Sequence, residues 1–250
     1  MILRNSFRRM AATLAYASAA VILLLADPPA RAQALAVLPV NILFAPGQRA
    51  ASLTVTNEGT SETAIQIRAY AWSQKDGDDQ LTDSDAVVLS PPIARMAPGS
   101  SQVIRLILRQ APQGREATYR ILIDQIPPPA EPGVVHMVLR MSIPIFAQPP
   151  TRAVPHVQFH LEVDSGKLFL VAINDGLSHE VIRDVVLSAS NGRKLKEEET
   201  STLPYILAGA TRRWPIAAQG SLPQPGETLQ LIAHSDAGAI DQPVGFVSAP

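Results

Sequence analysis

Residues 134–146 have the sequence Val-Val-His-Met-Val-Leu-Arg-Met-Ser-Ile-Pro-Ile-Phe, and this stretch decides the fold class. Apolar side chains occupy every second position, at Val135, Met137, Leu139, Met141, Ile143 and Ile145. Because successive side chains of a strand point to opposite faces, a period of two predicts a β-strand with one apolar face. We therefore expect the longest strand of the chain between Gly133 and Gln148.

Two interpretations of this apolar row are open. Periodicity alone favours an ordinary core strand that fills its own domain. Alternatively, part of the row is held open to a partner protein. A sheet edge that offers free backbone groups and alternating apolar side chains is suited to pairing with a strand of another molecule.

The sequence on both sides of this strand repeats the same kind of pattern. Short apolar or β-branched runs are separated by turn residues, such as the acidic turn Lys75–Asp79. Pro149-Pro150 cannot continue a central strand, so we expect a linker over 149–154. The regular turn signals predict an all-β protein of two β-sandwich domains, over 33–148 and 155–250.

The N-terminus has the features of an export signal. Arg4, Arg8 and Arg9 precede an apolar run, and Ala30-Arg31-Ala32 is a small-x-small cleavage site. The mainly apolar run from Ala11 to Ala26 has sixteen residues and is short for a bilayer, which needs about 20. We therefore predict a cleaved signal peptide over 1–32 rather than a retained anchor, with cleavage after Ala32 or Ala34 and no membrane insertion afterwards.

Composition argues against several classes of function. Removing residues 1–32 takes away four arginines and one aspartate, which changes the formal net charge from −1 to −4. Nucleic-acid-binding domains are usually basic. The chain has no cysteine, no Gly-x-Ser-x-Gly elbow and no Gly-rich phosphate loop, and His156 and His160 lack a third metal ligand nearby. We expect no catalytic site, no metal and no cofactor.

Three motifs in order resemble a known family. Arg115-Glu116-Ala117-Thr118-Tyr119 is followed by Ile126-Pro127-Pro128, the segment 91–99 by Ile104-Arg105-Leu106, and Ser235-Asp236-Ala237-Gly238 occurs late in the chain. This order is similar to that of the periplasmic pilus-assembly chaperones of the chaperone–usher pathway, and it extends over nearly the whole mature chain.

The resemblance implies a fold and a mechanism. It implies two immunoglobulin-like sandwiches in a boomerang arrangement, located in the periplasm. It also implies a non-enzymatic chaperone that binds pilus subunits by donor-strand complementation and delivers them to an outer-membrane usher. The side chains lent to the subunit would be Val135, Met137, Leu139 and Met141. The alternatives are a structural or adhesive sandwich protein of a surface pilus, and a periplasmic enzyme on the same scaffold.

The sequence departs from the family at one important place. Better-known members anchor the carboxylate at the subunit's C-terminus with a basic pair, and the matching positions here are Asn41 and Pro144. This suggests a divergent branch, such as the archaic chaperones. Because a buried carboxylate needs a cation or several N–H donors, Arg140 and Arg68 are the candidate anchors.

The resemblance also implies a network of charged side chains near the domain interface, formed by Arg105, Glu116 and Asp236. Its role would be to orient the two sandwiches, because paired charges fix geometry more reliably than they add stability.

Overall fold

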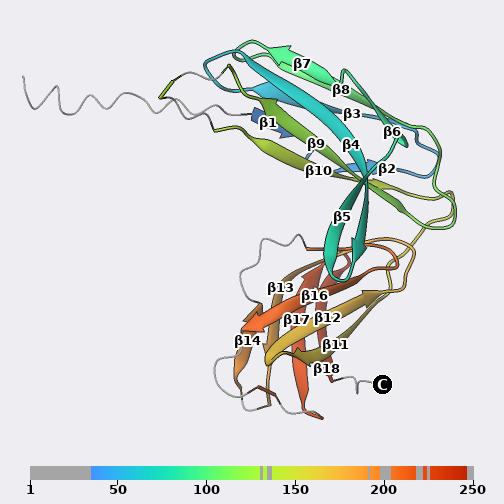
Figure 1. Ribbon diagram of the computed structural model, residues 1–250. Helices are drawn as coiled ribbons and strands as arrows, with labels where there is room; N and C mark the ends of the chain where they lie inside the picture. The colour runs from blue at the N-terminus through green and yellow to red at the C-terminus, as the bar shows by residue number, and fades with distance from the viewer. Residues whose placement is uncertain are drawn as a thin grey trace, which may run out of the picture.

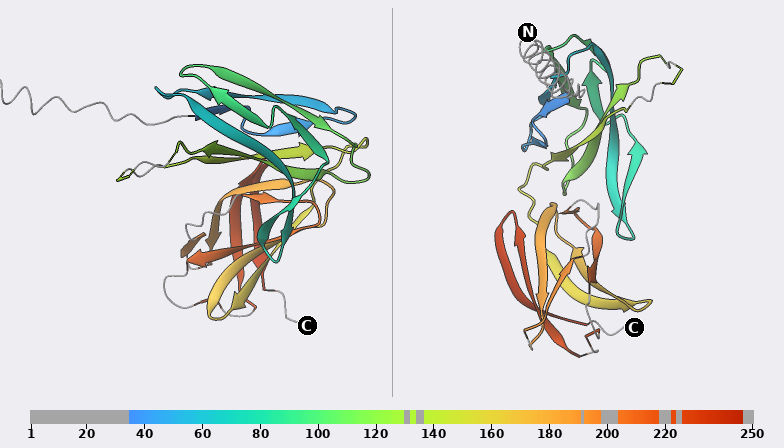
Figure 2. Two further views of the ribbon diagram at one scale, coloured as in Figure 1. Left: turned by 45° about the horizontal axis from the view of Figure 1, so that its top comes forward. Right: turned by 90° about the vertical axis from the view of Figure 1, so that its left-hand side faces the viewer.

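The computed structural model describes residues 35–129, 132–133, 137–190, 192–197, 204–217, 222–223 and 226–246. The predicted signal peptide and Val135 lie outside these residues. Within the described part, no helix is long and apolar enough to cross a membrane. The chain forms two β-lobes that meet at an angle (Figure 1 and Figure 2). The all-β prediction with two domains is confirmed.

The strands of the first lobe are β1 (Leu35–Leu38), β2 (Ile42–Phe44), β3 (Ala50–Asn57), β4 (Thr63–Lys75), β5 (Asp78–Asp83), β6 (Val87–Ser90), β7 (Ile93–Met96), β8 (Ser101–Leu108), β9 (Ala117–Ile126) and β10 (Arg140–Ala147). Those of the second lobe are β11 (Val157–Asp164), β12 (Lys167–Asn174), β13 (Glu180–Ser188), β14 (Lys194–Glu197), β15 (Tyr205–Ile206), β16 (Thr211–Ala217), β17 (Thr228–Ser235) and β18 (Gly238–Gly245).

The first lobe is a sandwich of two sheets. One sheet has the order β1-β3-β8-β6, and the other has the order β2-β10-β9-β4-β5 with β7 also paired to β4. Alternate residues of each strand face inward, so Leu53 and Val55 of β3 pack against Ile121 and Ile123 of β9 in a single apolar core. This is the arrangement that period-two patterning specifies.

The second lobe is a strongly curled sheet rather than two separate sheets. Its strands follow the order β11-β12-β16-β14-β13-β17-β18, with β15 paired to β13. The edge strands β11 and β18 meet where Leu161 forms a parallel bridge with Phe246. The curled sheet encloses its own core, which includes the fully buried Trp214.

The hairpin of β4 and β5 reaches from the first lobe to the second (Figure 1). Its tip is formed by Asp76 and Gly77, which both have positive φ (54° and 88°). Two central residues with positive φ are typical of a type I′ turn, whose twist matches that of the strands it joins. The acidic turn predicted from sequence is therefore the tip of an arm between the domains.

Candidate functional site at the edge of β10 and the domain interface

The apolar row that defines the fold is divided between core and surface. Ile143 and Ile145 are buried in the core of the first lobe, and Met141 packs against that core. Met137 and Leu139, by contrast, are 91% and 41% exposed. One half of the row is therefore an ordinary core strand, and the other half is exposed, as the second interpretation requires.

The strand is shorter than the sequence predicted. β10 begins at Arg140, and the longest strand is β4, with 13 residues. The reason lies in the neighbouring strand, because β9 ends at Ile126 and three prolines follow it. Continuing the register of β9 and β10 would place prolines 127–129 opposite residues 137–135. Proline has no N–H to donate, so the ladder of hydrogen bonds stops there.

The outer edge of β10 is mostly free. Its other neighbour, β2, pairs with it only over residues 145–147. The Gln125 N–H donates to the Leu139 carbonyl at 2.9 Å, and extending the register of β9 and β10 by one position places these two residues opposite one another. In an antiparallel pair, hydrogen-bonded and non-hydrogen-bonded positions alternate. The main-chain groups of Arg140, Ser142 and Pro144 therefore point away from β9.

Proline is tolerated at position 144 for the same reason. Its nitrogen faces the outer edge, where no ladder hydrogen bond is required. The free edge offers the N–H groups of Arg140 and Ser142 together with the carbonyls of these two residues, whereas β2 begins to pair at Ile145. A strand of another molecule could pair with this edge.

The two arginines proposed as anchors lie together on the outer face of this sheet. Arg68 of β4 donates to Asp124 of β9 at 2.6 Å, and Arg140 of β10 donates to the other oxygen of the same carboxylate. Partial burial raises the pKa of Asp124, but the hydrogen bonds from Arg140 and Arg68 outweigh it and hold this pKa below its ordinary value. Two cations thus share one internal anion.

A third arginine, Arg120, was not identified from the sequence. It lies on β9 directly opposite Pro144 and is only 3% exposed. Its Cζ lies 3.6 Å from the ring centroid of Trp72 and 5.6 Å from that of Tyr205. Burial lowers the pKa of Arg120, and its Nη2 has no hydrogen-bond partner among the described residues. An arginine directly before the apolar run Ile121-Leu122-Ile123 was the signal that could have revealed it.

The aromatic side chains that contact Arg120 also join the two lobes. Trp72 and Phe146 of the first lobe form a buried cluster with Leu207 and Ala210 of the second, and Tyr205 packs against it. The Trp72 and Tyr205 rings meet edge to face at 5.5 Å. Because Phe146 belongs to β10, the candidate partner-binding strand is rooted in the domain interface.

The arm formed by β4 and β5 adds polar contacts across the interface. Gln74 accepts from the Leu207 N–H at 3.0 Å and donates to the Tyr205 carbonyl at 2.9 Å. The buried Arg212 donates to the Gly77 carbonyl at 2.7 Å and pairs with Asp79 at 3.3 Å. These bonds tie the tip of the arm to the second lobe.

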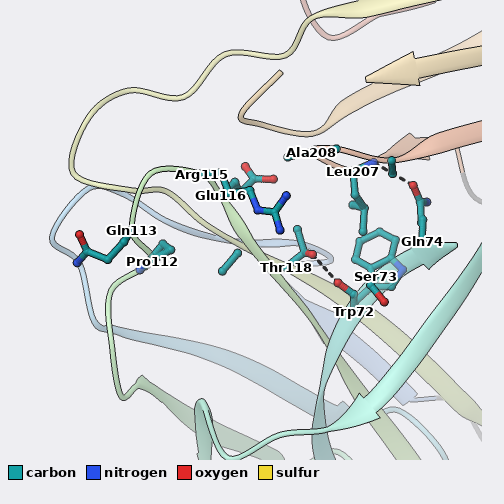
Figure 3. Close-up of a pocket in the computed structure, with 13 residues that line it drawn as sticks. Trp72, Ser73, Gln74, Pro112, Gln113, Arg115, Glu116, Thr118, Leu207 and Ala208 are labelled. Carbon is teal, nitrogen blue, oxygen red and sulfur yellow. Dashed lines mark hydrogen bonds between the residues drawn. The ribbon is translucent and has the colours of Figure 1, made fainter. Parts of the chain in front are cut away.

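A cavity of about 500 Å³ lies between the lobes. Figure 3 shows Gln74 bonded to Leu207 on one side of it and the Thr118 hydroxyl bonded to the Trp72 carbonyl, with Arg115 and Glu116 near the opposite side. Glu116 is the buried acid at this end of the interface.

The predicted network of Arg105, Glu116 and Asp236 is wrong. Arg105 lies on the exposed face of β8, and Asp236 pairs with Arg183 at 2.9 Å inside the second lobe. Among the described residues, no ion pair joins any two of the three. Arg105 lies on β8 of one sheet, and its side chain points to solvent. Glu116 directly precedes β9 of the other sheet, so the two side chains are not brought together.

Glu116 instead binds a loop of the second lobe. Its carboxylate accepts from the His179 Nδ1 at 2.7 Å, the His179 N–H at 3.1 Å and the Ser178 hydroxyl at 3.1 Å. Gln148, which follows β10, donates to it at 2.6 Å. The expectation that Glu116 lies near the interface is correct, but its partners were not predictable from the motif.

The sequence of the first lobe is similar to that of known proteins. Residues 34–153 match the model of the PapD N-terminal domain of pili and flagellar-assembly chaperones. Chaperone protein FimB/FhaD of Bordetella pertussis is 26% identical over 134 residues, which cover 48% of this chain and 53% of that protein. Chaperone protein PapD of Escherichia coli is 24% identical over 112 residues, which cover 43% and 45%. The chain thus spans about half the length of the curated relatives it matches.

A structural relative covers both lobes. A chain of the CsuC–CsuE chaperone–tip adhesion subunit pre-assembly complex, from archaic chaperone–usher Csu pili of Acinetobacter baumannii, aligns with a TM-score of 0.62. It is 20% identical, and the match covers 86% of this chain and 100% of that chain. This likeness establishes the two-domain fold. Residues 34–153 thus match the N-terminal domain of pili and flagellar-assembly chaperones.

Proposed function

We propose that this protein is a periplasmic chaperone that binds pilus subunits by donor-strand complementation and delivers them to an outer-membrane usher. The observation that carries the proposal is the combination of exposed Met137 and Leu139 with a backbone edge over residues 140–142 that has no partner strand among the described residues. Relatives described as chaperones, and a fold shared with a chaperone–subunit complex, support it.

The mechanism follows from the two halves of the apolar row. The buried half fixes the strand in its own domain, so the exposed half is presented on a rigid base. A subunit that lacks a strand would pair with the free edge and bury Met137 and Leu139 in its own groove. Each such side chain contributes about 1.5–3 kcal/mol when fully buried. Val135, outside the described residues, and the half-buried Met141 would extend the row at either end.

Exchange of the subunit is compatible with this arrangement. The bound subunit would gain a few apolar side chains and a short ladder, rather than a complete core. A better-fitting strand from the next subunit can then replace β10 during assembly. The chaperone role needs no hydrolysis, and the proposed activity is binding alone.

The carboxylate at the subunit's C-terminus would require a cation near β10. Arg140 and Arg68 remain candidates, although an incoming carboxylate would have to compete with Asp124 for them. Arg120 is the third candidate, because its Nη2 has no partner among the described residues and it lies opposite Pro144. Access to it requires movement of the aromatic rings that cover it.

The test is co-expression with a pilus subunit encoded beside an usher gene in the same genome. We expect a soluble one-to-one complex that a peptide copying the next subunit's N-terminal extension displaces. If the subunit aggregates equally with and without this protein, the proposal is wrong.

A further inference from the structure

We propose that His179 of the second lobe is a positioning residue for β10, which it holds through Phe146 and Glu116 at the root of the strand. The inference rests on the proposed function for its consequence, but its structural part concerns the free protein. His179 contacts no part of the exposed edge, so it would act through the residues that carry that edge.

The first contact is a ring stack across the domain interface. The His179 and Phe146 ring centroids are 3.5 Å apart, and their planes differ by 10°. Phe146 is 3% exposed and is the penultimate residue of β10. Stacked aromatic rings attract each other beyond the burial of their area, so each restricts the tilt of the other. The orientation of Phe146 therefore depends on a ring supplied by the other domain.

The second contact fixes the His179 ring itself. Because the Glu116 carboxylate only accepts, Nδ1 of His179 carries the proton in their 2.7 Å hydrogen bond. The Glu116 side chain is fully buried, and the His179 main-chain N–H and Ser178 hydroxyl also donate to it. A buried carboxylate with several donors has little freedom to move, because each lost bond leaves a desolvated charge.

Both contacts converge on the same end of β10. Glu116 immediately precedes Ala117, which is opposite Ala147 in the register of β9 and β10. Gln148, the residue after β10, also donates to Glu116. The C-terminal end of β10 is thus held by the second lobe, whereas the exposed Met137 and Leu139 precede its N-terminal end.

Through these contacts, the second lobe fixes the orientation of β10, and with it the orientation of the free edge relative to the second lobe. The outer face of the sheet that buries Phe146 against the second lobe continues along β10 to Ser142 and Arg140, which are exposed. A partner that pairs with this edge lies beside the angle between the lobes. Fixing that angle before binding removes an ordering cost from the association step.

Three substitutions separate the two contacts. His179→Phe keeps the stack and removes the donor to Glu116, His179→Asn keeps a donor and removes the stack, and His179→Ala removes both. The matched control is His234→Ala, because His234 is an exposed histidine of the same lobe whose one ion-pair partner among the described residues is Asp184. Each protein is measured by small-angle scattering, by amide exchange of β10 and by affinity for the co-expressed pilus subunit.

We expect His179→Ala to broaden the interdomain distance distribution, to speed amide exchange at Met141, Ile143 and Ile145, and to weaken subunit binding by about tenfold or more. The two conservative variants should each show about a threefold loss. The His234→Ala control should match the wild type in all three measurements.

The proposal is overturned if His179→Ala lowers the melting temperature but leaves scattering, amide exchange and affinity at the wild-type values, because His179 would then be only a stabilising contact. Scattering and exchange are measured on the free protein. If the wild type fails to bind any pilus subunit, the proposed function fails, and these two measurements still decide the positioning role.

Discussion

Pro144 of β10 lies directly opposite Arg120 of β9, close to the cluster of Trp72 and Phe146 that packs against the second lobe. Proline supplies neither charge nor N–H at this point, whereas the arginine beside it is buried against Trp72 with one guanidinium nitrogen unpartnered among the described residues. The positive charge that β10 lacks at Pro144 is therefore present on the neighbouring strand β9, at Arg120.

The exposed and buried halves of the apolar row should respond differently to mutation. Met137→Ser with Leu139→Ser should abolish the subunit complex without changing thermal stability, because both side chains are exposed in the free protein. Ile143→Ala in the same strand should cost about 2–4 kcal/mol of unfolding free energy, because it leaves a cavity in the core. Denaturant unfolding and co-purification measure the two effects. A complex that survives the double serine change would rule out donation of this strand.

A proline scan can test the direction of the free edge. Ser142→Pro removes an N–H that points outward, so the fold should persist while subunit affinity falls by about tenfold. Met141→Pro removes an N–H that points toward β9 and should destabilise the domain by about 3 kcal/mol or more. Circular dichroism and binding titrations distinguish the two. Equal destabilisation by both variants would contradict the assigned edge.

The acid dependence of stability should include a contribution from Asp124. Its pKa is lowered in the folded state, so the contribution is full above the unfolded pKa and is lost as the pH falls through the folded pKa. Asp124→Asn should therefore flatten the fall in stability below about pH 4. The arginines are substantially exposed, so the effect should be modest. Urea unfolding from pH 7 to pH 2 measures it, and identical pH profiles would exclude the pairing.

Arg120→Met tests the buried cation. Methionine retains contact with Trp72 and removes a desolvated charge, so the melting temperature should stay equal or rise. If Arg120 receives the subunit's carboxylate, affinity should fall by about tenfold, and amidation of that carboxylate should weaken wild-type binding to a similar extent. Arg140→Ala and Arg68→Ala are the comparison arms. Loss of affinity in these arms with none in Arg120→Met would assign the anchor to the pair around Asp124.

Much of the architecture could be predicted from local patterns. The alternation in 134–146 gave a strand with an apolar face, and Pro149-Pro150 gave a break before the second strand series. The structure has both, with β10 ending at Ala147 and β11 beginning at Val157. Short strands such as β1, β2 and β5 are hard to predict in this way, because three to six residues without clear alternation carry little periodic signal.

The pairing of charged residues could not be predicted in the same way. Arg105, Glu116 and Asp236 were grouped by motif, yet Glu116 binds His179, 63 residues away in another domain. Arg68 and Arg140 were both named as candidate anchors, but their common partner was not foreseen: the register of three strands brings both to Asp124. Such contacts depend on strand register and domain docking, which no local pattern specifies.

By itself, the sequence determined that the chain forms strands, where they break, and that residues 135–145 carry an apolar row, because the alternation of side chains and the missing proline N–H are local properties. The tertiary structure decided which half of that row is buried. That outcome depends on where β9 ends, on how far β2 extends along β10, and on the lobe that packs against Phe146, all of which involve residues distant in the chain.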